Sequence, residues 1–351
     1  MAATSNYVCS PDNCILVTGS NGFIGLKVVE TLFQYGFFNL RCFVRPSSRI
    51  GRLKQILSEH SAEDTVQLIQ GDLLSPDDCR KAAKEVSIIL HLAAGMEKSF
   101  AGAFMNSALA TRNLMEAFLE HGQPKRFVNV SSFAVYSNLM LKRGAVLDET
   151  CSLEDSPAER CDAYGFGKLK QEELVRLYGQ EHGLPYVIVR PGAVFGPGKR
   201  ALSGRVGIDT FGFFIHLGGS NLLPLTFVDN CAEAIVLAGL TPDVDGEIFN
   251  IVDDELPTSR QFFRAYRKKT GCFSISFPYS LTLALCRLWE RYAKWSKNQL
   301  PPVFNYRRCA AEWKGNRYCN RKLKERLRWQ PRVNMSSAIA AFLNQFDTET
   351  S

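Results

Sequence analysis

Short apolar runs alternate with amphipathic segments through the first two-thirds of the chain. Seven of the runs predict strands: Cys14–Val17, Leu40–Val44, Val66–Ile69, Ser87–Leu90, Phe127–Val130, Tyr186–Val189 and Ile248–Ile251. The segments between them carry apolar residues at helical spacing and predict helices: Leu26–Phe33, Leu53–His60, Pro76–Lys84, Asn106–Glu120 and Lys168–Glu181. This order predicts an α/β fold, a doubly wound parallel sheet with helices on both faces and right-handed crossovers.

The alternation weakens after Arg190-Pro191, where eight glycines fall between positions 192 and 219. Such a loop-rich stretch indicates the start of a second, smaller subdomain. We therefore expect a dinucleotide-binding domain and a C-terminal substrate-binding subdomain, each made of two segments: 12–190 with 226–254, and 191–225 with 255–346.

A glycine-rich turn joins the first predicted strand to the first predicted helix. Gly19 permits a tight turn, Gly22 lets backbone N–H groups approach a phosphate, and Gly25 lets the helix pack close to the strand. The helix dipole favours the negative charge. We predict a Rossmann-type dinucleotide site here, with a turn that binds nothing as the alternative. The residues assigned to it are Gly19, Asn21, Gly22, Phe23, Ile24 and Gly25.

The composition is that of a globular protein, because 46% of the 351 residues are hydrophobic and 22% are charged. Eleven irregularly spaced cysteines without a C-x-x-C pair, and only five histidines, lead us to expect neither a disulfide framework nor a metal site. The first eleven residues lack the pattern of a signal peptide, and no run of about eighteen apolar residues predicts a membrane span. We expect a cytoplasmic protein.

The net charge of +7 is concentrated late in the chain, where residues 287–332 hold fourteen Lys or Arg and three acids. This basic segment could face an anionic substrate, an anionic membrane surface or only solvent. It carries no recognised nucleic-acid-binding motif, so we expect no nucleic-acid partner.

An aromatic, basic and amphipathic helix is predicted over 280–297. Its apolar stripe consists of Leu281, Leu285, Leu288, Tyr292 and Trp295. Three interpretations stay open: a helix packed on its own core, the wall of an apolar substrate pocket, or peripheral contact with a membrane.

Tyr164 and Lys168 stand four residues apart at the start of a predicted helix, so they share one of its faces. A phenol with a pKa of about 10 is a poor base at neutral pH, whereas a nearby ammonium stabilises the phenolate. Ser132 follows a predicted strand at the carboxyl edge, where open α/β sheets bind ligands, and could hydrogen-bond a reacting carbonyl. Ser132, Tyr164 and Lys168 are therefore the predicted catalytic residues.

With these residues the sequence resembles the extended short-chain dehydrogenase/reductase superfamily, also called the NAD-dependent epimerase/dehydratase family. The resemblance covers nearly the whole chain through short motifs: Thr18–Gly25, Gly71-Asp72-Leu73, His91–Ala94, Ser131-Ser132 with Val135-Tyr136, Tyr164 with Lys168, Arg190-Pro191, Gly196-Pro197-Gly198, Phe227–Asn230 and Leu327–Pro331. In many relatives the helices that correspond to Asn106–Glu120 and Lys168–Glu181 pair between subunits, which implies a homodimer.

The resemblance also implies roles for individual residues. Tyr164 would be the general acid/base, Lys168 would bind the nicotinamide ribose and lower the pKa of Tyr164, and Ser132 would orient the substrate oxygen. The remaining implied cofactor contacts are Tyr164 itself, Asp72 and Leu73 at the adenine, Ala93 and Ala94 along the phosphates and ribose, and Pro191 near the nicotinamide. His91, in an apolar strand, is predicted to be a satisfied core residue, and Asn106 to cap its helix.

The end of the second strand carries Arg45 where NAD-specific folds offer an acid to the adenosine ribose. Arg45 lies twenty residues after Gly25, and Ser47 and Arg49 could complete a pocket for a 2′-phosphate. We therefore predict NADP as the cofactor. NAD is the alternative, because some family members with an arginine at this position use NAD.

Two departures from the sugar-nucleotide epimerases of the family argue against a nucleotide sugar. The chain has Ala193 where those enzymes have an Asn after a strand-ending Arg, and its segment Tyr306–Glu312 lacks their Arg-x-Gly-Asp stretch. The run Pro191–Pro197 and the aromatic helix before Pro301-Pro302 look more like the 3β-hydroxysteroid dehydrogenase and dihydroflavonol reductase branch. Those enzymes act on larger, less polar alcohols and ketones.

The sequence thus predicts an NADP- or NAD-dependent oxidoreductase that moves hydride between the nicotinamide and a small-molecule secondary alcohol or ketone. A nucleotide-sugar 4-epimerase or dehydratase and a non-catalytic dinucleotide sensor are the alternatives; the complete set of three catalytic residues argues against the sensor. A long polar cleft lined by Arg307, Arg308 and Arg317 would favour a nucleotide sugar over an apolar substrate.

Overall fold

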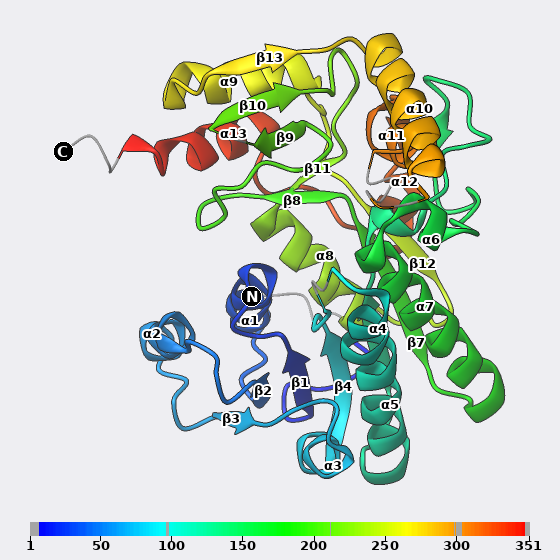
Figure 1. Cartoon of the computed structure of the whole chain (residues 1–351). Coiled ribbons are helices and arrows are strands. Elements are labelled where there is room, and N and C mark those ends of the chain that lie inside the picture. The colour runs from blue at the N-terminus through cyan, green and yellow to red at the C-terminus, as the bar shows by residue number, and fades with distance from the viewer. Residues whose placement is uncertain (1–6, 96–97, 211, 298, 300–303, 348–351) are drawn as a thin grey trace.

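Seven strands form one parallel sheet in the larger part of the molecule (Figure 1). The computed structural model describes residues 7–347 except 96–97, 211, 298 and 300–303. The strand order is β12-β7-β5-β4-β1-β2-β3. Their bounds are β1 Cys14–Thr18, β2 Leu40–Val44, β3 Val66–Gln70, β4 Val86–His91, β5 Arg126–Val130, β7 Tyr186–Pro191 and β12 Ile248–Ile251. All seven strands predicted from the apolar runs are confirmed, and each pairs in parallel with its neighbours.

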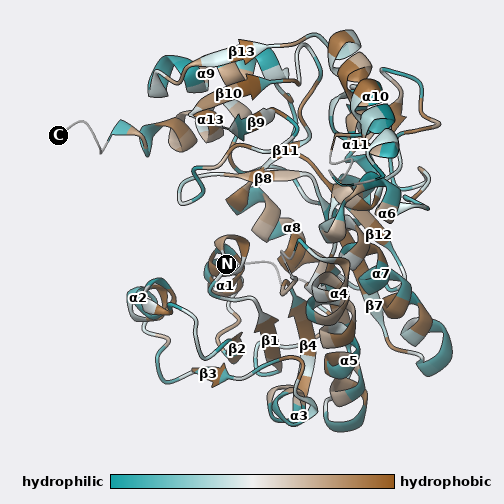
Figure 2. Cartoon of the chain, in the orientation of Figure 1, coloured by the Kyte–Doolittle hydropathy of each residue, from teal (hydrophilic) through white to brown (hydrophobic). Residues whose placement is uncertain are grey.

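Helices cover both faces of this sheet, because successive residues of each strand face opposite sides. In β1, Ile15 and Val17 join one core cluster with side chains of α1, α2 and α8, whereas Leu16 joins a second cluster with α3, α5 and α7. These helices are α1 Phe23–Gln34, α2 Gly51–Glu59, α3 Pro76–Ala83, α5 Ala110–His121, α7 Ala163–His182 and α8 Val228–Leu240. Figure 2 shows the inner strands as the most continuously apolar part of the chain. The doubly wound arrangement is confirmed.

The helix expected to start at Asn106 begins earlier and contains an irregular turn. Its first part, α4 (Phe100–Ala103), starts after Ser99, whose hydroxyl caps it by accepting a backbone N–H at 3.1 Å. A π-helical segment (Phe104–Leu109) then leads directly into α5. The prediction that Asn106 caps the helix is wrong, because the chain is already helical before it.

The chain leaves the large sheet after β7 and returns to it for β12. The smaller C-terminal subdomain contains short strands: β8 Ala193–Phe195 paired with β11 Leu225–Phe227, and β9 Gly207–Thr210, β10 Phe213–His216 and β13 Ser274–Ser276 in a second sheet. A two-residue pairing joins β6 Val146–Leu147 to β14 Arg317–Tyr318. The further helices are α6 Pro157–Arg160, α9 Ser259–Thr270, α11 Tyr306–Trp313, α12 Arg321–Leu327 and α13 Met335–Asn344.

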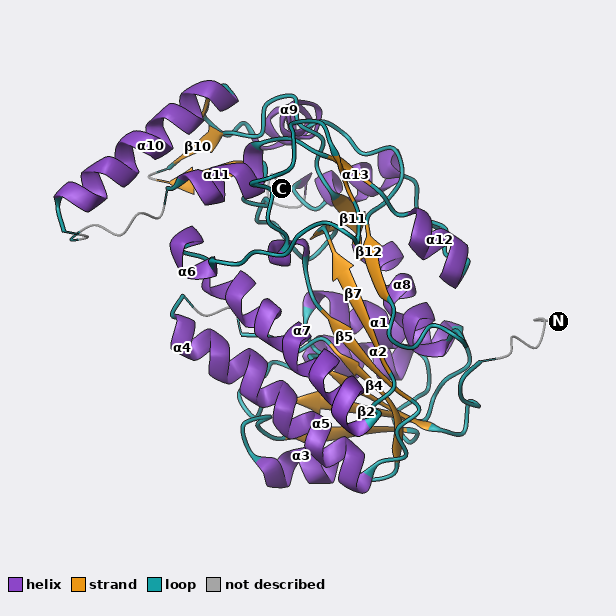
Figure 3. Cartoon of the chain, turned by 90° about the vertical axis from the view of Figure 1, so that its right-hand side faces the viewer, coloured by secondary structure: helices purple, strands orange, loops and turns teal. Residues whose placement is uncertain are grey.

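The late amphipathic helix predicted from its apolar stripe is present as α10 (Tyr279–Trp295). Figure 3 shows it at the outer edge of the smaller subdomain, with α11 on its inner side. The Pro301-Pro302 pair that follows lies outside the described residues, as does the start of the chain through residue 6. Within the described ranges, no helix has the length and apolar character needed to cross a bilayer.

Candidate active site

The glycine turn between β1 and α1 allows a close approach of backbone and ligand. Gly19 has a φ of 68°, and a Cβ at this position would lie 3.1 Å from the backbone nitrogen of Ala93. A Cβ on Gly25 would overlap the carbonyl of Gly19. Gly22 is the N-cap of α1 and has no side chain to cap it, so the first N–H groups of the helix are open to an anion. This geometry fits the diphosphate of a dinucleotide.

A groove of about 450 Å³ extends from this turn over the carboxyl ends of β1, β2, β3 and β4. Eight of the predicted cofactor residues line it: Gly19, Asn21, Gly22, Arg45, Asp72, Leu73, Ala93 and Ala94. The structure therefore brings together residues from four separate strand ends, in the place where a Rossmann fold binds its dinucleotide.

Other predicted cofactor residues lie outside the lining of this groove. Ile24 packs against the core cluster of α1, and Gly25 lies under the turn. Phe23 faces the smaller subdomain, with the Lys199 ammonium 5.8 Å from its ring centroid. Pro191 is buried at the end of β7. Contacts of these four residues with a cofactor stay predictions.

One cation and one hydroxyl from the end of β2 face the groove. Arg45 is exposed and lines the groove together with Ser48. Ser47 and Arg49, the expected partners of Arg45, are not among the lining residues. Of the three side chains predicted to form a 2′-phosphate pocket, only Arg45 lines the groove, and the hydroxyl beside it is that of Ser48.

Two asparagines that sequence reasoning did not assign to the cofactor site contribute to the groove. Asn106 lines it from the π-helical segment, which turns this side chain toward the carboxyl ends of the strands. Asn113 in α5 donates its side-chain amide to the carbonyls of Leu73 at 3.1 Å and Leu74 at 3.2 Å, and so fixes the turn after β3. No local pattern identifies Asn113, because its partners lie about forty positions earlier in the chain.

A second cavity, of about 680 Å³, lies at the carboxyl ends of β5 and β7, along the same edge of the sheet. Ser132, just after β5, and Tyr164, in the first turn of α7, both line it. Their hydroxyls lie close enough for Ser132 to lower the pKa of Tyr164. The pair predicted from the motifs is thus assembled on the wall of a substrate-sized cavity.

The surroundings of Tyr164 keep its hydroxyl protonated. Burial raises the pKa of Tyr164, and the Ser132 hydroxyl offsets only part of that rise. At neutral pH the phenol is therefore a proton donor in this state of the protein.

Lys168 lies one helical turn after Tyr164 and is only 3% exposed. Its Nζ donates a hydrogen bond to the carbonyl of Val130 at 2.6 Å. Burial lowers the pKa of Lys168 to about 7, although the Glu172 carboxylate raises it. Lys168 makes no hydrogen bond to Tyr164 in the part of the chain that the structure describes, so its predicted effect on the pKa of Tyr164 stays a prediction.

A buried ion pair holds α7 against the sheet. Glu172 accepts hydrogen bonds from Arg190 in β7, at 2.8 Å from Nε and 2.7 Å from Nη2, and from the hydroxyl of Ser131 at 2.6 Å. Burial raises the pKa of Glu172, but the hydrogen bonds and charge of Arg190 outweigh it and keep that pKa below its usual value. These contacts hold the helix of Tyr164 against β7 and against the end of β5, the strand that precedes Ser132.

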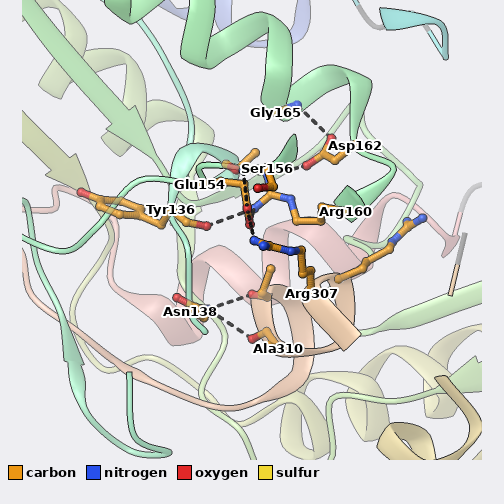
Figure 4. A network of polar contacts seen from close by, with 12 residues as sticks. Tyr136, Asn138, Glu154, Ser156, Arg160, Asp162, Gly165, Arg307 and Ala310 are labelled. Atoms are coloured by element: carbon orange, nitrogen blue, oxygen red, sulfur yellow. Dashed lines mark hydrogen bonds and ion pairs between the residues drawn. The ribbon is translucent and has the colours of Figure 1, made fainter. Parts of the chain in front are cut away.

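A second network joins the loop after β5 to the start of α7 (Figure 4). Arg160, 2% exposed, donates to the carbonyls of Ala134 and Tyr136 and to the carboxylate of Asp162 at 2.7 Å. Asp162 is the N-cap of α7 and accepts a backbone N–H of its first turn at 2.8 Å. Arg160 therefore connects the segment that carries Ser132 to the helix that carries Tyr164.

Arg307 of α11 completes this network from the smaller subdomain. It contacts Glu154 at 2.8 Å, Asp155 at 2.9 Å and Glu159 at 2.9 Å. Glu154 lies 3.6 Å from Arg160 in turn. Arg307 is thus engaged with three carboxylates.

The cavity around Tyr164 carries a surplus of positive charge. Lys98, Arg160, Arg205 and Arg308 line it together with two acids, Asp162 and Glu312. Arg308 pairs with Glu312 at 3.1 Å, and Arg205 donates to the carbonyl of Ala311 at 3.0 Å. Of the three arginines whose presence would favour a nucleotide sugar, only Arg308 lines this cavity, because Arg307 contacts acids and Arg317 lies exposed in β14.

His91 is a satisfied core residue, as predicted. Its ring nitrogens are hydrogen-bonded to the hydroxyls of Thr18 at 2.8 Å and Thr111 at 2.9 Å. Burial, together with the charge of Lys168, lowers the pKa of His91 to about 3, so the ring is neutral at physiological pH. Within the described residues, no group of three or more His, Cys, Asp and Glu side chains could hold a metal ion.

Comparison with known proteins agrees with this architecture. A family model described as "NAD dependent epimerase/dehydratase family" matches residues 15–252. An uncharacterized UDP-glucose epimerase, YtcB, of Bacillus subtilis is 30% identical over 254 residues, covering 68% of this chain and 76% of the relative. A decarboxylating sterol-4-alpha-carboxylate 3-dehydrogenase, ERG26, of Candida albicans is 28% identical over 353 residues, covering 93% of this chain and 95% of the relative.

Solved structures share the same fold. The structure of a UDP-glucuronic acid 4-epimerase from Bacillus cereus in complex with NAD matches with a TM-score of 0.71 at 21% identity. The match covers 96% of this chain and 100% of that chain. The large sheet and the smaller subdomain are therefore both part of the shared architecture.

Proposed function

The chain belongs to the NAD-dependent epimerase/dehydratase family, and we propose that this enzyme is an oxidoreductase that interconverts a secondary alcohol and a ketone with NADP or NAD. One observation carries the proposal: Ser132 and Tyr164 lie together on the wall of a cavity, at the same sheet edge as the dinucleotide-type groove. A hydroxyl pair in this position can hold and protonate a carbonyl oxygen.

Tyr164 is the proposed acid and base. In the reducing direction its protonated hydroxyl donates a proton to the oxygen of the ketone, and in the oxidising direction the phenolate takes the proton of the alcohol. Ser132 donates a hydrogen bond to the same oxygen and orients it. When bound, the nicotinamide supplies or accepts the hydride.

Lys168, one helical turn after Tyr164, supports this proton transfer. With a pKa of about 7 it changes charge readily near neutral pH. In its charged form it favours the phenolate over the phenol, because an ammonium close to a phenol stabilises the anion. The resemblance assigns the same Nζ to the nicotinamide ribose.

We propose a substrate with an apolar body and an anionic group. Small apolar side chains such as Ala134, Ala163 and Ala193 form part of the cavity wall. The same wall carries four cationic side chains and two acidic ones. The Candida albicans relative, which matches over nearly its whole length, is named for a sterol that carries a carboxylate. Such a molecule combines both features.

A nucleotide-sugar 4-epimerase is the second candidate. The Bacillus subtilis relative and the Bacillus cereus structure favour it by their names, and Arg205 with Arg308 could face a diphosphate. Ala193 and the absence of a Gly-Asp pair in Tyr306–Glu312 speak against it.

The test is to purify the protein by gel filtration, denature it and identify by mass spectrometry any nicotinamide nucleotide that it releases. Near-stoichiometric NAD would indicate an enzyme that recycles a captive cofactor, as an epimerase does, and would contradict the proposal. An exchangeable site that binds NADPH more tightly than NADH supports it. Turnover should then be assayed with sterol 3β-alcohols with and without a 4-carboxylate, with dihydroflavonols and with UDP-glucose. Epimerisation of UDP-glucose without net oxidation would overturn the proposal.

A further inference from the structure

Helix α10 leaves one apolar face exposed to solvent. The helix contacts the protein through another face, where Thr282, Cys286 and Ala293 are buried. The exposed stripe consists of Leu281 (43% exposed), Leu285 (46%), Leu288 (59%), Tyr292 (45%) and Trp295 (79%). Their spacing of three and four residues places them in one line along the helix. No residue of α10 lines the cavity of Tyr164, so this stripe is not a wall of that cavity.

Cations flank the stripe on the exposed surface. Arg287, Arg291, Lys294 and Lys297 are all exposed. The one acid of α10, Glu290, is half-buried and accepts the backbone N–H of Tyr306 at 2.8 Å. The outward surface of α10 is therefore apolar and positively charged.

Aromatic rings gather toward the carboxyl end of α10. Trp289 and Tyr292 lie 6.1 Å apart between ring centroids, and Tyr292 and Trp295 lie 5.8 Å apart. Tyrosine and tryptophan rings combine an apolar body with a polar edge, so they prefer the boundary between water and lipid.

We propose that α10 lies in the plane of an anionic phospholipid bilayer and docks the protein on the membrane surface. The stripe would enter the boundary of headgroups and acyl chains, and the flanking Lys and Arg would face the phosphates. A second copy of the chain fits this surface less well, because a symmetric contact between two such helices would bring like charges together.

The position of α10 gives this docking a consequence for the active site. Cys286 of α10 and Cys309 and Trp313 of α11 belong to one buried cluster, and α11 contributes Arg308, Ala311 and Glu312 to the cavity. Helix α11 therefore lies between α10, which carries the apolar stripe, and the cavity. An apolar substrate dissolved in the bilayer would reach the cavity by a short path, but the docking itself does not depend on the proposed function.

The test is co-flotation of the whole protein with vesicles. Phosphatidylcholine vesicles are compared with vesicles of equal parts phosphatidylcholine and phosphatidylserine. We expect binding to the anionic vesicles, weakened at least about tenfold by Leu288→Gln/Trp295→Gln, because two large side chains leave the apolar contact. Arg291→Gln/Lys294→Gln should weaken it roughly fivefold for each cation and reduce the preference for phosphatidylserine.

Met140→Gln is the matched control, because Met140 is 90% exposed but lies outside α10. This variant should bind vesicles like the unmodified protein. Equal binding by the stripe variant, or no binding of the unmodified protein to either vesicle, would overturn the proposal. So would a dimer in sedimentation that the stripe variant abolishes while vesicle binding is absent, because the stripe would then be a contact between copies of the chain. Dinucleotide binding by each variant confirms that it is folded.

Discussion

The large sheet and the smaller subdomain build their ligand-facing surfaces in different ways. In the sheet, backbone geometry shapes the groove. Glycines bring main-chain atoms together, and small residues at four neighbouring strand ends line the groove. In the cavity beside it, side chains from distant segments form the wall, and ion pairs such as Arg308 with Glu312 position them. The difference suggests that cofactor binding and substrate turnover can be altered separately.

Tyr164→Phe gives the largest expected effect. Removal of the hydroxyl that protonates the substrate oxygen should lower kcat by about 10²- to 10⁴-fold. The dissociation constant of the dinucleotide, measured by fluorescence titration, should stay nearly unchanged, because Tyr164 lines the second cavity rather than the groove. Unchanged turnover would end the proposed mechanism.

Gly25→Ala should affect dinucleotide binding, which Tyr164→Phe is expected to leave nearly unchanged. The added Cβ overlaps the Gly19 carbonyl, so the turn has to shift, at a cost of about 1–3 kcal/mol. We expect the dissociation constant of the dinucleotide to rise roughly tenfold to a hundredfold. Gly51→Ala is the control, since a Cβ there meets no atom within 4 Å. Equal affinities of the two variants would contradict the role of backbone contact in the turn.

Arg160→Lys tests the network between the two regions. Lysine keeps the charge but cannot donate at once to the carbonyls and to Asp162, so Ser132 and Tyr164 lose their fixed separation. Turnover should fall about tenfold while dinucleotide affinity holds. Arg112→Lys, at a half-exposed ion pair of α5, should leave both unchanged. A loss of dinucleotide affinity without a loss of turnover would show that the network serves the groove instead.

Arg45→Ala should change the choice of cofactor. Loss of a charge-assisted contact with a 2′-phosphate is expected to weaken NADPH about tenfold or more and to leave NADH nearly unaffected. Arg49→Ala, on the same turn but outside the groove lining, should change neither affinity. If both arginine variants bind NADPH equally well, the prediction of NADP loses its basis.

Lys168 leads to a prediction about stability as a function of pH. Because the pKa of Lys168 is about 7 in the folded protein and 10.5 is its ordinary value, the folded state binds fewer protons between these limits. The free energy of unfolding should therefore rise with pH in this window, by at most about 1.4 kcal/mol per pH unit from this group. Lys168→Met should flatten that rise in urea denaturation of the dinucleotide-free protein. Parallel curves for the two proteins would exclude the contribution.

The two regions also differ in how far the sequence predicts them. Strands such as Cys14–Val17 were predictable because a buried parallel strand is a continuous apolar run. Helix α8 was missed because it is buried on nearly all sides between α1 and the sheet, so it has no polar face to reveal its period.

Within the site, local motifs identified Ser132 and Tyr164. Arg160 and Arg205 could not be assigned to the cavity from the sequence, because their contacts join residues far apart in the chain. Arg205, for example, donates to the carbonyl of Ala311, 106 positions later. Such contacts depend on the path of the loops, which the periodicity of apolar residues does not predict.

The excursion of the chain between β7 and β12 has a consequence for its synthesis. The ribosome completes the glycine turn, Ser132, Tyr164 and Lys168 before it makes β12, the strand that covers the outer side of β7. Until residues 248–251 emerge, β7 presents an unpaired edge, which is a template for pairing with other chains. A nascent chain that already holds every predicted catalytic residue thus still exposes the edge of β7, and this edge is paired only after the whole first segment of the smaller subdomain, 191–225, has been synthesised.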